Sequence, residues 1–122
     1  MAAILLAEDD DSMRQFLTLA LEKAGHRVTP CADGLLAMEA LQGDDAEEFD
    51  LLLADIVMPG MDGIELSQKA TALYPDLKVM FITGFAAVAI GQTAMAAPHA
   101  RVLSKPFHLN DLVTQVNELL AS

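Results

Sequence analysis

Side chains that could do chemistry follow the short apolar runs of this sequence. They are three carboxylates, one hydroxyl and one amine: Glu8, Asp9, Asp55, Thr83 and Lys105. Carboxylates held close together repel one another, and a hard divalent cation relieves that repulsion. Mg²⁺ prefers oxygen ligands and typically uses one or two carboxylates. We therefore predict a Mg²⁺ site with Asp9 and Asp55 as direct ligands and Glu8 acting through a water molecule.

A calcium-binding EF-hand loop is the obvious alternative for this acidic run. Counted from Asp9, the fifth position of such a loop is Met13 and the sixth is Arg14. The loop requires an oxygen ligand and a glycine at these two positions, so the pattern fails.

A carboxylate beside Mg²⁺, a hydroxyl and an ammonium group can receive a phosphoryl group. We predict that Asp55 attacks phosphorus to give an aspartyl phosphate. Lys105 would then neutralise charge on the phosphoryl oxygens, and Thr83 would donate a hydrogen bond to them.

Apolar runs and helical periodicity alternate along the chain. The pattern predicts strands at 3–7, 27–31, 51–54, 79–83 and 101–104. It predicts helices at 13–24, 34–42, 64–73, 86–97 and 109–120, the second one capped by Asp33. Five such units favour an α/β fold, a parallel sheet with helices on both faces. Pro30 cannot donate to a sheet ladder, so strand 27–31 is expected at an edge. The carboxyl ends of these strands meet at one rim, which brings the five side chains together.

Composition limits the classes of function that are open to the chain. The 122 residues fit one domain, 1–122, with no second one beside it. The net charge of −11 and only seven basic residues argue against nucleic acid and against anionic membranes. Cys31 has no partner for an internal disulfide, and no signal peptide or membrane span is recognisable. A cytoplasmic location is therefore expected.

The chemical residues and their surroundings resemble the receiver domain of two-component response regulators, the CheY-like family. The resemblance covers the whole chain and rests on residues 6–10, Asp55 with the loop 58–63, Thr83-Gly84 and Lys105-Pro106-Phe107. It implies a doubly wound, flavodoxin-like fold of five parallel strands in the order 2-1-3-4-5. It also implies that Asp55 is the phosphoacceptor and Glu8 and Asp9 the acidic pair. The backbone carbonyl of Val57 would complete the metal ligands, and the Lys105–Pro106 bond would be cis.

Further stretches are similar to the CpdR-type single-domain regulators of bacteria. They are residues 55–66, 78–87 and 103–109. This resemblance implies that a histidine kinase or histidine phosphotransferase supplies the phosphoryl group. It also implies an adaptor that, when unphosphorylated, primes the ClpXP protease to degrade cell-cycle substrates.

Five further positions carry more specific expectations. Val102 stands where many receivers have an aromatic switch residue, so signalling would use backbone shifts or Phe85. Val57 and Phe85 are apolar and could exclude water from the phosphoryl group, which would make it long-lived. Equal and rapid phosphate loss from wild type and Phe85→Ala would contradict that idea. Among the methionines, Met38 is expected in the core and Met61 on the surface.

Two other functions stay open at this point. The chain could be a phosphate relay or sink between histidine proteins, with the same site and no protease output. It could also be a Mg²⁺-dependent phosphatase with an aspartyl nucleophile, although such an enzyme would want an acid where Val57 stands. The favoured hypothesis is that the protein is a non-enzymatic phosphoacceptor that assists its own phosphorylation and dephosphorylation.

Overall fold

The computed structural model describes residues 2–43, 49–84 and 100–122. Its elements, in chain order, are β1 (Ala3–Ala7), α1 (Asp11–Lys23), β2 (Arg27–Cys31), α2 (Gly34–Gln42), β3 (Leu51–Asp55), α3 (Gly63–Leu73), β4 (Lys78–Thr83), β5 (Arg101–Ser104) and α5 (Leu109–Ala121). The five predicted strands and four of the predicted helices are confirmed, and each begins and ends within two residues of its predicted bounds. The predicted helix 86–97 and Phe85 lie outside the described residues.

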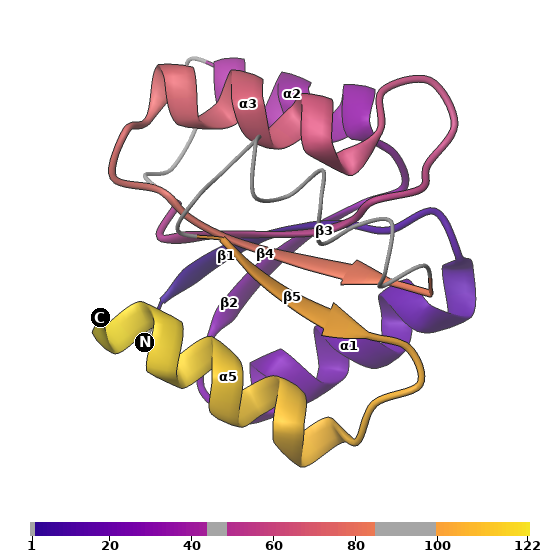
Figure 1. The fold of residues 1–122 in the computed structure, drawn as a ribbon, viewed down its shortest axis with the longest axis vertical. Helices are drawn as coiled ribbons and strands as arrows, with labels where there is room; N and C mark the ends of the chain where they lie inside the picture. The colour runs from indigo at the N-terminus through magenta and orange to yellow at the C-terminus, as the bar shows by residue number, and fades with distance from the viewer. Residues whose placement is uncertain (1, 44–48, 85–99) are drawn as a thin grey trace.

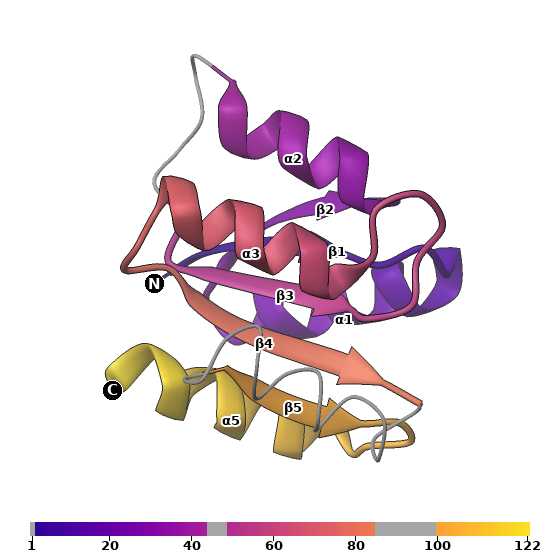
Figure 2. The same cartoon turned by 45° about the horizontal axis from the view of Figure 1, so that its top comes forward.

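All five strands are parallel and follow the order β2-β1-β3-β4-β5. This is the doubly wound topology expected from the sequence, with β2 at an edge as Pro30 indicated. In Figure 1, α2 and α3 cover one face of the sheet while α1 and α5 cover the other. Figure 2 shows the same layers turned, with the arrowheads of the strands at one end of the molecule.

The central strands are buried on both faces because alternate residues enter different cores. In β1, Leu5 packs in the core beneath α2 and α3, while Ile4 and Leu6 pack in the core beneath α1 and α5. In β3, Leu52 and Leu53 divide in the same way. Strands of this kind read as continuous apolar runs, which is why the sequence predicted them.

Aspartates begin three of the helices. Asp10, Asp33 and Asp62 each accept a hydrogen bond from the backbone N–H three residues further on. An N-cap of this kind satisfies a helix donor that would otherwise lack a partner. Asp33 is confirmed in the role predicted for it.

Met61 is buried, with 7% of its surface exposed, so its predicted exposure is wrong. The reason is Gly34, whose missing side chain lets the start of α2 approach the backbone of Met61 closely. The loop before α3 is thereby folded onto the core that contains Met38, which is buried as predicted. Among the described helices, none is long and apolar enough to cross a membrane.

Candidate functional site

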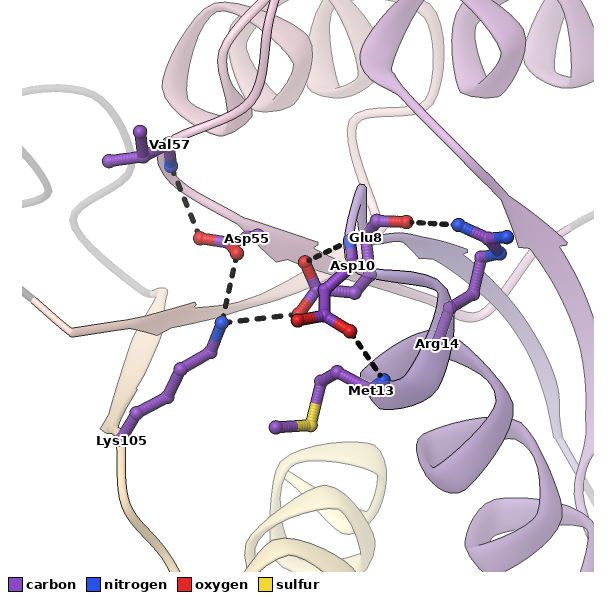
Figure 3. A network of polar contacts seen from close by, with 7 residues as sticks. All are labelled: Glu8, Asp10, Met13, Arg14, Asp55, Val57 and Lys105. Carbon is purple, nitrogen blue, oxygen red and sulfur yellow. Dashed lines mark hydrogen bonds and ion pairs between the residues drawn. The ribbon is translucent and has the colours of Figure 1, made fainter.

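The five predicted side chains come from four strands whose carboxyl ends share one rim. Asp55 ends β3 opposite Ile82, and Thr83 ends β4 opposite Ser104. Glu8 directly follows β1, and Lys105 directly follows β5. The register of the sheet therefore places these strand ends side by side. Figure 3 shows Glu8, Asp55 and Lys105 pointing toward one another.

Lys105 joins the two sides of the site. Its Nζ donates to Asp55 Oδ2 at 3.0 Å and to Glu8 Oε1 at 3.2 Å (Figure 3). Burial alone would lower the pKa of Lys105, but the bonds to Asp55 and Glu8 outweigh it, so the pKa is raised. The ammonium group is therefore charged and fixed beside Asp55.

A backbone hydrogen bond also holds Lys105 in place. Its amide donates to the carbonyl oxygen of Thr83 at 2.8 Å, which links it to the end of β4. The Lys105–Pro106 bond is cis, as predicted.

Glu8 is the most buried acid of the site, with 1% of its surface exposed. Burial, as the main cause, and the neighbouring Asp55 carboxyl group, as the next, together raise the pKa of Glu8 to about 7 against a smaller lowering by Lys105. A carboxyl group in this position loses its hydration without full compensation from Lys105. A second cation near Glu8 would favour its ionised form.

The donor set fits a divalent metal ion. Carboxylate oxygens of Glu8, Asp9 and Asp55 all lie within 4.8 Å of one another. Glu8 and Asp55 are buried, while Asp9 is exposed at the mouth of the site. Hard oxygen ligands with one open side suit Mg²⁺, which keeps several of its waters.

The remaining acids of the run 8–11 are used elsewhere. Asp10 Oδ1 accepts from the amide of Met13 at 3.0 Å and so caps α1. Asp11 forms an ion pair with Arg14. Four consecutive acids therefore contribute two carboxylates to the cluster, a division that the composition of the run did not reveal.

Val57 and Thr83 border the site in different ways. The amide of Val57 donates to Asp55 Oδ1 at 3.2 Å, while its side chain is 56% exposed. Thr83 is completely buried at the end of β4. The metal-binding role of the Val57 carbonyl and the hydrogen bond from Thr83 to a phosphoryl group stay predictions.

Sequence reasoning missed an apolar groove next to Lys105. A cavity of about 390 Å³ is lined by Met13, Phe16, Lys105, Pro106 and Phe107. Phe16 stands three residues after Met13, a spacing that predicts both on the apolar face of one helix, but Phe16 is 51% exposed. The groove joins α1 to residues 105–107, a neighbour far away in the sequence that periodicity within one helix does not show.

Comparison with known proteins gives matches along nearly the whole chain. The family described as the response regulator receiver domain matches residues 4–117. The response regulator receiver protein CpdR of Brucella abortus (strain 2308) is 59% identical over 120 residues, which cover 98% of each chain. The sensor kinase CckA of the same strain is 36% identical over 119 residues, which cover 98% of this chain and 12% of the kinase. A solved CheY-like receiver domain protein from Methanospirillum hungatei has a TM-score of 0.89 at 30% identity, covering 99% of this chain and 94% of that chain.

Proposed function

The chain belongs to the receiver domain family of two-component response regulators, and from this premise we propose that Asp55 is its phosphoacceptor. The observation that carries the proposal is the pair of contacts made by Lys105 Nζ, to Asp55 and to Glu8. They place a fixed cation next to a carboxylate that lies at the rim of the sheet. A phosphoryl group carried by Asp55 would thus form beside a positive charge that is already oriented.

The transfer is a substitution at phosphorus. A carboxylate oxygen of Asp55 attacks the phosphorus of a phosphohistidine, a P–O bond forms, and the P–N bond to the donor imidazole breaks. The imidazole leaves with the electron pair of that bond and takes up a proton. Lys105 stays protonated and offsets negative charge on the transferred group. Attack by water on the aspartyl phosphate later releases inorganic phosphate and restores the Asp55 carboxylate.

Glu8, Asp9 and Asp55 would hold Mg²⁺, with the Val57 carbonyl as a further ligand. Once bound, the ion supplies positive charge that offsets repulsion between the acidic site and the incoming phosphoryl group. Both its ligand set and its identity are part of this proposal. They are supported by the clustering of the three carboxylates and by the raised pKa of Glu8.

Incubation with acetyl phosphate and MgCl₂, followed by intact-protein mass spectrometry, tests the proposal. We expect wild type to gain one phosphoryl group and Asp55→Asn to gain none. Asp76→Asn is the matched control, because Asp76 is an exposed acid at the opposite end of the sheet. Equal labelling of wild type and Asp55→Asn would overturn the assignment of Asp55.

We further propose that phosphorylation controls binding to other proteins, and that the chain acts as an adaptor for ClpXP proteolysis. The support is the similarity to CpdR, which extends over 98% of both chains. The proteins degraded with the help of this chain would be proteins of the cell cycle. Its phosphodonor would be a histidine kinase or histidine phosphotransferase. The receiver alone is not expected to turn over small phosphate esters, which separates it from an aspartyl phosphatase.

Binding to purified ClpX tests this output. We expect unphosphorylated wild type and Asp55→Ala to bind ClpX, and phosphorylated wild type to bind it at least tenfold more weakly. Equal binding of both forms, or none, would contradict the adaptor. Rapid phosphate exchange with a histidine phosphotransferase, in the absence of ClpX binding, would identify a relay.

A further inference from the structure

Arg14 contacts the acidic loop at two points. Its Nη1 donates to the backbone carbonyl of Glu8 at 3.0 Å, and its Nη2 pairs with Asp11 Oδ1. Figure 3 shows the guanidinium group reaching back from α1 to the Glu8 carbonyl. The side chain of Arg14 is only 22% exposed, so packing fixes its position. None of these contacts is with the carboxylates of the proposed metal cluster.

The first contact orients Glu8. The amide of Glu8 donates to the carbonyl of Cys31 at 3.1 Å, and its own carbonyl accepts from Arg14. The peptide groups on both sides of Glu8 are therefore held, one by β2 and the other by α1. With its backbone fixed in this way, the Glu8 side chain is directed toward Lys105 and the site.

The second contact separates Asp11 from the cluster. Asp11 is 89% exposed and lies only two residues after Asp9. Pairing with Arg14, which is three residues along the same helix, keeps Asp11 on the outside of α1. Four adjacent acids are thus divided between the site and the surface.

We propose that Arg14 is a positioning residue for the Mg²⁺ site. It acts through the Glu8 carbonyl and through Asp11, and it requires both donors of its planar fork. The inference rests on the metal site of the proposed function. Groups that orient metal ligands from outside the ligand set commonly change metal affinity by about 10–100-fold when they are altered.

A purely electrostatic role for Arg14 would have the opposite sign. A cation near the acidic cluster repels Mg²⁺, so removing its charge would tighten binding. Replacing it by lysine would keep that charge and leave affinity nearly unchanged. Positioning predicts instead that lysine fails, because one ammonium group cannot reproduce the two separated donors of the guanidinium fork.

Calorimetric titration of the metal-free proteins with MgCl₂ distinguishes the two roles. We expect Arg14→Lys and Arg14→Gln each to weaken Mg²⁺ binding by roughly tenfold, the lower end of the range for such groups. Arg101→Gln is the matched control. It removes a guanidinium group that pairs with Glu118 away from the site, and its affinity should equal that of wild type.

A second measurement reports on the backbone between Glu8 and Asp9 in the metal-free protein. The Asp9 amide belongs to the peptide group whose carbonyl accepts from Arg14. Its ¹⁵N chemical shift should change in both Arg14 variants and not in Arg101→Gln. Unchanged Mg²⁺ affinity in Arg14→Lys, or tighter binding in Arg14→Gln, would overturn the inference alone. A wild-type chain that binds no Mg²⁺ would overturn the proposed metal site and this inference together.

Discussion

At the scale of single residues, environment decides what each acid does. Glu8 is buried beside Asp55 and Lys105, whereas Asp9 is exposed. Asp10 accepts a helix amide, and Asp11 pairs with Arg14. The four side chains carry the same chemical group, so their different roles come from their different burial and their different partners. The burial of Glu8 has a consequence for stability.

We expect Glu8→Gln to stabilise the metal-free protein at pH 8. Burial, with Asp55 beside it, raises the pKa of Glu8 from 4.5 to about 7, so the folded state binds this proton more tightly than the unfolded state. That contribution is fully present below about pH 4.5 and is lost as pH rises through 7. Glutamine carries no charge at either pH and avoids the loss.

Chemical denaturation in EDTA at pH 5 and pH 8 measures this effect. The stability gain of Glu8→Gln over wild type should grow between these two pH values, by up to about 3 kcal/mol. The same variant should bind Mg²⁺ more weakly, because it lacks one carboxylate. A gain that is equal at both pH values would show that Glu8 does not titrate differently in the folded state.

At the scale of elements, the start of α1 combines a polar loop with an apolar groove. The groove lined by Met13, Phe16, Pro106 and Phe107 includes Lys105 in its wall, and so it continues directly into the proposed acceptor site. A protein that delivers a phosphoryl group to Asp55 must cover this region. A small phosphodonor need not touch it.

We therefore expect Phe16→Ser to slow phosphotransfer from a phosphorylated histidine phosphotransferase by roughly tenfold. This is the scale of one interface contact worth about 1.4 kcal/mol. Labelling by acetyl phosphate should not change. Leu73→Ser removes another exposed apolar side chain, at the far end of α3, and serves as the control. If phosphotransfer from both donors slows equally, Phe16→Ser acts on the site around Asp55 and not on docking of the phosphotransferase.

The beginning of α3 lies closely against the end of β3. A Cβ atom on Gly63 would collide with the backbone carbonyl of Asp55, and the amide of Gly63 donates to Ile56 at 2.9 Å. We expect Gly63→Ala to lower the free energy of unfolding by about 1–3 kcal/mol, because backbone atoms cannot move aside easily. Gly43→Ala is the control, since its Cβ would make an ordinary contact of 3.5 Å with Glu39. Equal stability of the two variants, measured by chemical denaturation, would contradict this account.

The sequence predicted the sheet well because its strands are short, apolar and buried on both faces. The apolar run at 51–54, followed by turn residues, predicts a buried strand that ends at Asp55, and this is β3. The site followed from strand ends alone, since parallel strands deliver their ends to one rim. Contacts between separate elements were harder to foresee. The burial of Met61 depends on Gly34, and the groove at Phe16 is formed with residues 105–107, which lie far away in the sequence.

At the scale of the whole molecule, negative charge is concentrated in one half of the chain. Residues 1–61 hold 13 acidic and 3 basic residues, a balance of −10 out of the total of −11. Such a balance destabilises the compact state through repulsion, and any added salt screens it. Stabilisation by Mg²⁺ would therefore combine a general component from screening with a specific component from the proposed binding at the cluster.

We expect MgCl₂ to raise the melting temperature of wild type more than NaCl at equal ionic strength. At about 100 times its Kd, a ligand that binds only the folded state adds about 2.7 kcal/mol of stability. Asp9→Asn should lose this specific part and keep the response to NaCl, because Asp9 belongs to the cluster but is exposed and can be replaced without disturbing the core. Identical curves for the two salts in wild type would mean that the acidic half is only screened, and that the carboxylates at the rim do not form a metal site.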